Sequence, residues 1–444
     1  MSDTASRPRP RVSRTSGPPA RLSLVFPLDR VTQVELDGAD LTLGREGSTV
    51  TFAVPTVSKV HLQLTWDEKA RTHVATDLGS KHGTTVDGVE LEAEQRRALQ
   101  HQSVLRLGDA VLVYEQLRPG AASATSQPTE ALPGLAAPMV RLREDVSRAA
   151  REATTALIIG ATGVGKESVA NELHRLSGRK GPFIAVNASA LSPQLAESQL
   201  FGHAKGAFTG ADSAKDGFFR AAQGGTLFLD EVGELSAELQ PKLLRAVQQR
   251  EVMAVGATSA VKVDVLIIAA TNRDLPREVE KGAFRRDLYA RLALWELRVP
   301  ALSERRCDVV EWLCRLQRKW AQERGVRTPP LALSAEVVEA VVRAALPENL
   351  RTLDRLVHLL GAKGELTLDA LPPWLFDAPG GGAAETVAKP AKSVKPAAPT
   401  REELQATLER LGSVRATAKH YERDRKQVYR WIEAFGLAWK DSDA

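Results

Sequence analysis

A glycine-rich stretch between an apolar run and a helix-like segment carries the residues best suited to phosphate chemistry. Residues 156–159 are apolar and suit a buried parallel strand. Residues 160–166 then read G-A-T-G-V-G-K, which fits the phosphate-loop spacing G-x-x-x-x-G-K. Glycines let backbone N–H groups close around a phosphate chain, and the lysine adds positive charge. We therefore predict nucleotide contacts at Gly160, Ala161, Thr162, Gly163, Val164, Gly165, Lys166 and Glu167.

Two acids at the end of a second apolar run supply groups for hydrolysis. Residues 226–231 read T-L-F-L-D-E, as a Walker B strand requires. There one carboxylate binds magnesium and the other orients a water, so we assign magnesium to Asp230 and the water to Glu231. A third apolar run, 265–270, leads to Asn272, which can contact the terminal phosphate or the attacking water. The expected cofactors are ATP and Mg²⁺.

The loop G-A-F-T-G-A at residues 206–211 places an aromatic side chain among small residues, which is a poor core element and a plausible moving tip. With this loop intact, residues 138–375 resemble the AAA+ domain of bacterial enhancer-binding proteins, the sigma-54-dependent transcription activators. Glutamate is normal after the lysine in that family, so Glu167 agrees with the resemblance, whereas a plain glycine turn is the alternative for the phosphate loop alone. The resemblance implies sigma-54 contacts at Gly206, Ala207, Phe208, Thr209, Gly210 and Ala211.

The same resemblance implies four further site residues. Asn187, at the end of a strand over 182–187, would hold the catalytic glutamate away until the nucleotide is sensed. Arg285 and Arg291 would be arginine fingers that act on a neighbouring subunit's nucleotide, the alternative being surface arginines of a helix. Arg351 would reach the nucleotide from a helical lid that begins near residue 301, although Leu346 and Glu348 replace the usual Trp and Gly in that segment.

Residues 21–117 show short alternating strands separated by turn signals, which predicts a β-sandwich. Candidate strands are 41–43, 61–66, 73–76 and 111–114. Together with G-R at 44–45, S-K-V-H at 58–61 and D-L-G-S-K-H-G-T at 77–84, this region resembles a forkhead-associated (FHA) domain.

An FHA domain captures the phosphate of a phosphothreonine with loop residues, chiefly through charge-assisted hydrogen bonds. The resemblance implies that His61 braces the loops. The alternative to a phosphate-binding domain is a domain that only packs against the ATPase. The ligand-binding residues that the resemblance implies are Arg45, Ser58, Lys59, Lys81 and His82. His82 departs from the family, which usually has asparagine at this position.

The last segment, residues 400–444, reads as three helices, with Val428 and Ile432 on the inner face. It resembles the Fis-type helix-turn-helix that ends many enhancer-binding proteins, and Trp431 is expected to pack rather than intercalate. The start of the second helix of such a motif reads base edges, so DNA contacts are predicted at Arg425, Lys426, Gln427 and Arg430. A basic helical tail that binds protein is the alternative.

Composition fits a protein of several domains. The chain has 444 residues, 43% hydrophobic and 26% charged, with a net charge of +5. No apolar run approaches the ~20 residues of a membrane helix, so we expect a cytoplasmic protein without membrane contact. Cys307 and Cys314 are expected to be buried thiols. The expected order is a disordered arm (1–20), FHA-like β-sandwich (21–117), flexible linker (118–137), α/β AAA+ P-loop domain with helical lid (138–376), linker (377–399) and all-α helix-turn-helix (400–444).

These features favour a sigma-54-dependent activator. Its expected partners are sigma-54 RNA polymerase holoenzyme, upstream enhancer DNA, a phosphothreonine protein or Ser/Thr kinase, and its own copies in a ring, with six as the family's usual number. Two alternatives remain, an AAA+ remodeller of another target and a DNA-binding regulator with an inactive ATPase.

Overall fold

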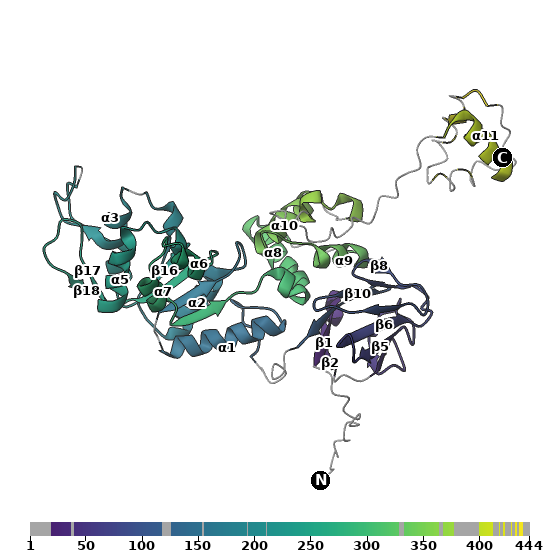
Figure 1. Ribbon diagram of the computed structural model, residues 1–444, viewed down its shortest axis with the longest axis horizontal. Helices are drawn as coiled ribbons and strands as arrows, with labels where there is room; N and C mark the ends of the chain where they lie inside the picture. Colours follow the sequence, from purple (N-terminus) through teal and green to yellow (C-terminus); the bar gives the residue numbers. More distant parts are fainter. Residues whose placement is uncertain are drawn as a thin grey trace, which may run out of the picture. The chain divides into compact units, whose positions relative to one another are not determined.

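The computed structural model divides the chain into two compact units, Met1–Pro379 and Gly380–Ala444 (Figure 1). The first unit contains a β-sandwich, an α/β domain and a group of helices, and the described part of the second is helical, in agreement with the predicted fold classes. The described residues are 19–36, 40–117, 126–152, 155–192, 194–209, 211–327, 333–363, 367–376, 399–411, 417, 421, 428, 431, 432 and 435–437.

The β-sandwich consists of two sheets whose inner faces share one apolar core. Its strands are β1 (Ala20–Phe26), β2 (Thr32–Leu36), β3 (Leu41–Gly44), β4 (Val50–Thr51), β5 (Leu62–Asp67), β6 (Thr72–Asp77), β7 (Thr84–Val86), β8 (Val89–Glu90), β9 (Arg96–Ala98), β10 (Val104–Leu107) and β11 (Ala110–Gln116). One sheet has the order β2-β1-β11-β10-β7-β8 and the other β4-β3-β5-β6-β9. Leu22 and Leu112 from the first sheet meet Leu43 and Leu64 from the second. All four predicted strands are confirmed.

A five-stranded parallel sheet forms the centre of the α/β domain. Its strands are β12 (Ala156–Ile159), β13 (Phe183–Asn187), β16 (Thr226–Asp230), β19 (Leu266–Thr271) and β20 (Trp295–Arg298), in the order β13-β16-β19-β12-β20. The four apolar runs identified in the sequence are the first four of these strands. Since the strands are parallel, β12, β16 and β19 all end at one edge, where the polar residues that follow them gather.

Helices cover both faces of this sheet. They are α1 (Ala137–Glu152), α2 (Lys166–Ser177), α3 (Ala196–Phe201), α4 (Phe218–Ala221), α5 (Leu239–Gln249), α6 (Leu275–Glu280) and α7 (Arg286–Leu292). Successive residues of a strand point to opposite faces. Accordingly Ile158 belongs to the core that includes Leu142 of α1, while Leu157 belongs to the core that includes Leu243 of α5.

Two short hairpins extend from this domain. The first pairs β14 (Gly202–His203) with β15 (Lys215–Asp216), and the loop 206–211 connects its strands. The second pairs β17 (Glu251–Val252) with β18 (Val261–Lys262). Backbone hydrogen bonds of 2.9 Å join the hairpins, from Ala204 N–H to Val255 O and from Val255 N–H to Gly202 O.

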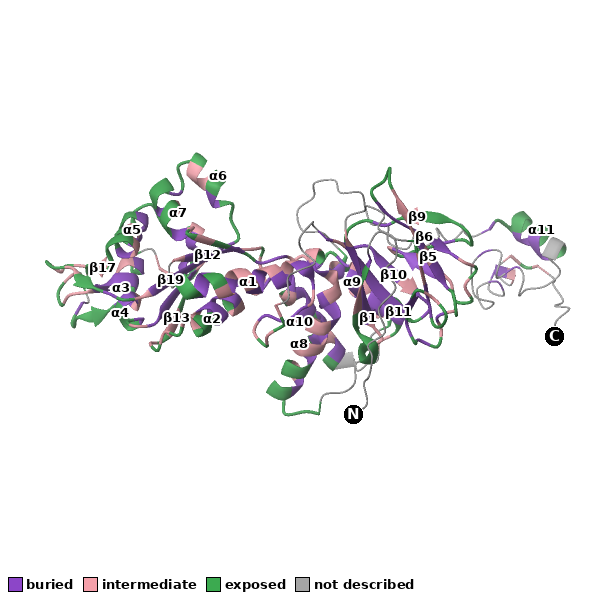
Figure 2. Ribbon diagram, turned by 90° about the horizontal axis from the view of Figure 1, so that it is seen from below, coloured by how far each residue is buried: buried purple, intermediate pink, exposed green. Residues whose placement is uncertain are grey.

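The helical lid shares its core with the β-sandwich. Its helices are α8 (Val309–Glu323), α9 (Ala335–Arg343) and α10 (Leu350–Lys363), with 3-10 turns at Leu302–Glu304, Arg306–Asp308, Leu368–Ala370 and Pro373–Leu375. Val104 of β10 and Val113 of β11 lie in one apolar cluster with Val338 and Val341 of α9. Buried residues accordingly colour both α9 and β10 in Figure 2.

The segment before α1 corrects the prediction of a flexible linker over 118–137. Residues 118–125 lie outside the described residues, but 126–136 are packed. Leu132 and Ala136 are buried. The Arg143 guanidinium donates to the carbonyls of Leu132 at 3.1 Å and Gly134 at 2.9 Å, and Asp308 Oδ1 accepts from the Ala136 N–H at 3.1 Å. These partners satisfy the backbone of a Pro/Gly-rich stretch that has no regular secondary structure.

In the second unit, α11 (Arg401–Leu411) carries Leu404 and Leu408 into a core with Tyr421, Val428 and Trp431. The rings of Tyr421 and Trp431 meet edge to face at 5.8 Å. The inner position of Val428 and the packing of Trp431 are therefore confirmed. The predicted linker 377–399 lies outside the described residues, apart from residue 399.

Candidate functional site

The phosphate loop connects β12 to α2 at the carboxyl edge of the parallel sheet. Lys166 is the first residue of α2 and is 7% exposed; its Nζ donates to Gly160 O at 3.2 Å. Gly163 has φ +74°, and a Cβ there would lie 2.1 Å from the Glu348 carbonyl oxygen of the lid. Only glycine fits this close approach. Glu167 is exposed in the first turn of α2, where a negative side chain stabilises the helix dipole.

The acidic pair follows β16 beside the lysine. Glu231 adopts a left-handed backbone with φ +52°, which is uncommon for a non-glycine residue and typical of constrained sites. Its Oε1 lies 3.4 Å from Lys166 Nζ, and its Oε2 accepts from the Asn272 N–H at 3.3 Å. Burial raises the pKa of Asp230, and the charge of Lys166 opposes this shift. Sequence and structure therefore bring Lys166, Asp230, Glu231 and Asn272 together.

The two predicted asparagines have different surroundings. Asn272 Nδ2 donates to Thr162 Oγ1 at 3.2 Å, so it bridges β19 and the phosphate loop. Asn187 Oδ1 instead accepts from the N–H of Ser189 at 2.9 Å and from its hydroxyl at 2.7 Å. Asn187 thus caps the 3-10 turn that follows β13, while Glu231 contacts Lys166. In this structure the predicted contact between Asn187 and Glu231 is not formed.

The three arginines predicted to contact a nucleotide, Arg285, Arg291 and Arg351, are all exposed. Arg285 precedes α7, and its guanidinium donates to both carboxylate oxygens of Asp287, at 3.0 and 2.8 Å. Arg291 lies in the last turn of α7. Arg351, in α10, leans over the phosphate loop, since a Cβ on Gly163 would lie 3.3 Å from its Cγ.

Two lid residues that sequence reasoning did not single out hold the phosphate loop. Asn349 Nδ2 donates to Thr162 O at 2.9 Å, and its Oδ1 accepts from the Leu302 N–H at 2.8 Å. Arg305 is 1% exposed and donates to Val164 O at 3.0 Å. The available signal for Arg305 was its place in the run P-A-L-S-E-R that opens the lid. For Asn349 it was an asparagine two residues after a proline, since asparagine tolerates the observed φ of +51°.

The loop 206–211 is held at its base and exposed at its tip. Gly206 N–H donates to Ala211 O at 2.8 Å. Phe208 is 38% exposed, Thr209 is also exposed, and the ring of His203 lies 5.1 Å from that of Phe208. The aromatic side chain is therefore exposed, as predicted. Gly210 lies outside the described residues.

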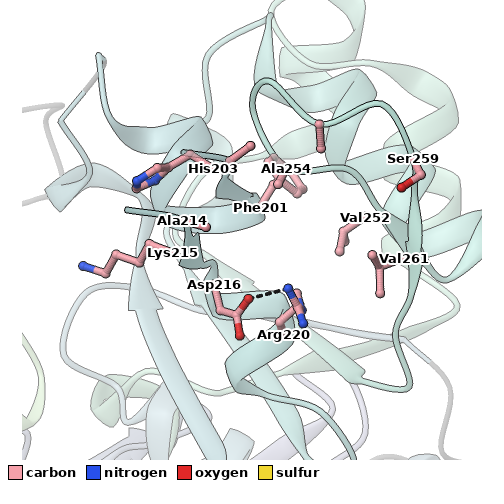
Figure 3. Close-up of a pocket in the computed structure, with 12 residues that line it drawn as sticks. Phe201, His203, Ala214, Lys215, Asp216, Arg220, Val252, Ala254, Ser259 and Val261 are labelled. Atoms are coloured by element: carbon pink, nitrogen blue, oxygen red, sulfur yellow. Dashed lines mark ion pairs between the residues drawn. The ribbon is translucent and has the colours of Figure 1, made fainter. Parts of the chain in front are cut away.

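A cavity of about 350 Å³ lies between the two hairpins at the base of this loop (Figure 3). Phe201 and Val252 give it apolar walls, and the ion pair of Asp216 and Arg220 lies at its rim. The described residues around it include no buried charged group that would mark a ligand site.

In the β-sandwich, the loops after β3, β4 and β6 converge. Arg45 N–H donates to Ser58 O at 2.8 Å, and Lys81 N–H donates to Ser58 Oγ at 3.1 Å. A Cβ on Gly44 would lie 2.0 Å from Lys59 O, so the loops approach too closely for any other residue. Where these loops converge, the side chains are exposed at Arg45, Lys59, Lys81 and His82.

The buried His61 braces these loops, as the resemblance implied. Its Nδ1 accepts from the Ser58 N–H at 3.0 Å, and its Nε2 then carries the proton that it donates to Gly83 O at 3.2 Å. Burial lowers the pKa of His61, which keeps the ring neutral and suits this pattern.

Three further predictions concern DNA contacts, the two cysteines and membrane spans. The DNA contacts predicted at Arg425, Lys426, Gln427 and Arg430 lie outside the described residues. Cys307 and Cys314 are free thiols, half-buried, and burial raises the pKa of each. Within the described ranges, none of the helices combines the length and the apolar composition of a membrane span.

Comparison with known proteins agrees with two of the three resemblances, those of the AAA+ domain and of the FHA domain. Residues 132–298 match the Sigma-54 interaction domain and residues 41–108 match the FHA domain. The chain is 44% identical over 223 residues to the transcriptional regulatory protein GlrR of Escherichia coli, covering 50% of this chain and 49% of that protein. It is 42% identical over 255 residues to the DNA-binding transcriptional regulator NtrC of Salmonella typhimurium, covering 56% and 54%. The chain thus spans about half the length of the curated relatives it matches.

A solved structure extends the likeness. The crystal structure of NtrX from Brucella abortus in complex with ADP is 31% identical, with a TM-score of 0.50, over 69% of this chain and 70% of that one. The match therefore extends over more than two thirds of both chains. The chain belongs to the family of sigma-54-dependent transcription activators, with an FHA domain ahead of its AAA+ domain.

Proposed function

We propose that this protein is an ATP-hydrolysing ring that remodels sigma-54 RNA polymerase holoenzyme at promoters. It is bound to upstream enhancer DNA by residues 400–444 and regulated by a phosphothreonine protein through its FHA domain. The observation that carries the proposal is the G-A-F-T-G-A loop. This loop, exposed at its tip, lies on a hairpin apart from a site that unites Lys166, Glu231 and Asn272.

The site suits a nucleotide with magnesium. Asp230 is half-buried beside the phosphate loop, and Mg²⁺ is usually bound by one or two carboxylates together with substrate phosphates. A set of three or more His, Cys, Asp or Glu side chains that could hold a metal alone is absent among the described residues. When bound, magnesium neutralises charge that develops on the phosphates. Asp230 is the residue that would hold it.

The chain's own groups divide the remaining work. Lys166 would bind the outer phosphates of ATP, and its withdrawal from Glu231 would free that carboxylate to orient the attacking water. Asn272 would position the same water or the terminal phosphate. Arg285 and Arg291 are exposed, as groups that act on a neighbour's nucleotide must be, and they would stabilise transition-state charge in a homo-oligomeric ring, with six subunits as the expected number.

In the FHA domain, Arg45 and Ser58 would bind the phosphate, since their loops are hydrogen-bonded to each other and remain exposed. A charge-assisted hydrogen bond contributes about 1.5–3 kcal/mol, so Arg45→Ala should weaken phosphopeptide binding about tenfold to a hundredfold. Equal binding of matched threonine and phosphothreonine peptides would contradict this role.

The decisive experiment measures ATP hydrolysis and promoter opening with purified sigma-54 RNA polymerase. We expect both activities, with opening dependent on hydrolysis. ATP hydrolysis without opening of any sigma-54 promoter would assign the protein to remodelling another target. Absence of hydrolysis by the assembled ring would assign it to DNA-binding regulation alone.

A further inference from the structure

Strand β7 begins where the phosphate-recognition loop ends. Residues 79–83 form the loop that carries Lys81 and His82, and Thr84 is the next residue. Its Oγ1 donates to Asp77 Oδ2 at 2.6 Å. The same carboxylate accepts from the Ser80 hydroxyl at 2.8 Å and, through Oδ1, from the Ser80 N–H at 2.7 Å. Thr84 is therefore tied to the conformation of the recognition loop.

The next residue of β7 is tied to the lid. Adjacent residues of a strand point to opposite faces, and Thr85 accordingly faces α9. Its Oγ1 donates to Glu339 Oε1 at 2.7 Å, and Glu339 Oε2 accepts from Arg106 Nε of β10 at 2.8 Å. Glu339 is 5% exposed and Thr85 is 7% exposed. Because water is excluded, breaking either contact leaves a buried carboxylate short of a donor, which is costly.

Helix α9 in turn leads to the phosphate loop. It ends at Arg343, and the chain continues directly to Asn349, which donates to Thr162 O at 2.9 Å. Leu350 N–H donates to Gly163 O at 3.0 Å. The helix that holds Thr85 at one point thus runs into the segment that contacts the phosphate loop. The route from Thr85 to the phosphate loop thus consists of helix α9 and the short loop 344–349, and a chain of packed and hydrogen-bonded groups of this kind can carry coupling between two sites.

We propose that nucleotide binding and phosphopeptide binding are thermodynamically coupled through the contact between Thr85 of β7 and Glu339 of α9. The proposal rests on the proposed function of the FHA domain in naming the phosphopeptide. A change in the recognition loop moves Thr84 and, with it, Thr85, so the lid feels the state of the loop. By reciprocity, each ligand changes the affinity for the other by the same factor, and such factors are typically about 5- to 150-fold.

The first test uses the full-length protein and a phosphothreonine peptide selected from a degenerate library by binding to it. The dissociation constant for ADP is measured with and without the peptide, and that for the peptide with and without ADP. We expect the two ratios to be equal and at least about fivefold in the wild type. Thr85→Val keeps the shape of the side chain and removes its hydroxyl, and it should bring both ratios close to one while the peptide still binds.

Thr65→Val is the matched control. The Thr65 hydroxyl is buried on β5 and has no hydrogen-bond partner among the described residues, so the same chemical change should leave the coupling intact. Glu339→Gln provides a second variant that keeps the side-chain size and should also reduce the coupling. Loss of the coupling in Thr85→Val, with the coupling kept in Thr65→Val, supports the proposal. Coupling ratios in Thr85→Val equal to those of the wild type overturn it.

A second measurement does not need the peptide. Hydrogen exchange of residues 78–86 is followed with and without saturating ADP. We expect ADP to change the exchange of this segment in the wild type and Thr65→Val, and not in Thr85→Val. Unchanged exchange in the wild type overturns the coupling, even if a phosphopeptide binds. Failure to find any phosphopeptide refutes the proposed FHA function alone, and the exchange result still decides the coupling.

Discussion

Lys166 and Glu231 contact each other at 3.4 Å, yet their chemistry differs. The lysine presents a positive charge that can bind phosphate in the ground state. The carboxylate is useful only while water attacks. The contact with the lysine occupies one acceptor site of Glu231 Oε1. Substitutions at these two positions should therefore affect different steps.

Lys166→Ala should raise the dissociation constant for ATP by about tenfold to a hundredfold, the equivalent of a lost charge-assisted hydrogen bond. Glu231→Gln should keep ATP binding and lower kcat by about a hundredfold or more, as expected for a lost general base. Equilibrium binding and steady-state ATPase assays distinguish these outcomes, with the exposed Lys180→Ala as control for lost charge. Near wild-type turnover by Glu231→Gln would show that another group orients the water.

A pH-dependent stability is expected at Glu115. Burial raises its pKa to about 7, and nearby Asp308 adds to the shift. The folded protein then binds a proton that the unfolded chain, with an ordinary pKa, has lost. Stability from this group is therefore present below its ordinary pKa of 4.5 and falls as pH rises to about 7.

Glu115→Gln should remove this loss, because the amide never ionises and its oxygen can still accept from Gln102 Nε2, now at 3.3 Å from Glu115 Oε1. Thermal denaturation at pH 5 and pH 8 is the measurement. We expect the melting temperature of the variant to exceed that of the wild type by a few degrees at pH 8, and to differ little at pH 5. A few degrees is about the shift that 1 kcal/mol causes in a domain of this size. An equal difference at both pH values would show that Glu115 does not titrate in this range.

At the scale of elements, the sequence was sufficient where the signal is local. Apolar runs predicted β12, β13, β16 and β19, and the phosphate-loop spacing predicted the start of α2. The contact of Thr85 with Glu339 could not be predicted, since the residues lie 254 positions apart and each is ordinary in its own element. The packing of 126–136 was missed because its partners, Arg143 and Asp308, belong to other elements. Asn349 was overlooked because its role depends on the lid touching the phosphate loop.

The hairpin of β14 and β15 should separate hydrolysis from its output. Thr209 is exposed and lies outside the group formed by Lys166, Glu231 and Asn272. Thr209→Ala should leave the ATPase rate within about twofold, as is usual for surface substitutions of less than 0.5 kcal/mol, and abolish binding of sigma-54. Parallel ATPase and sigma-54 binding assays test this, with Thr258→Ala in the second hairpin as a matched substitution. Loss of both activities together would make the loop part of ring assembly.

At the scale of the whole molecule, the two units have separable expected tasks. Removing residues 400–444 should preserve ATP hydrolysis and eliminate binding to the upstream site. Arg425→Ala in the full chain should weaken operator binding by about 1–3 kcal/mol if the side chain contacts a base. Operator binding and ATPase assays on both variants provide the measurement, and unchanged operator affinity of the shortened protein would place DNA recognition outside residues 400–444.

The shared core of the lid and the β-sandwich bears on how this regulator can be cut or recombined. Val338 and Val341 of α9 are covered by Val104 and Val113 of the sandwich. A protein that starts at residue 126 would leave these valines in water, and large exposed apolar patches promote aggregation. We expect that truncated protein to be poorly soluble, by centrifugation of expressed material, and to recover when Val338 and Val341 are both changed to Thr. Chimeras that attach a different domain to this AAA+ domain must therefore supply a replacement apolar surface for α9, because a connecting peptide alone would leave the lid uncovered.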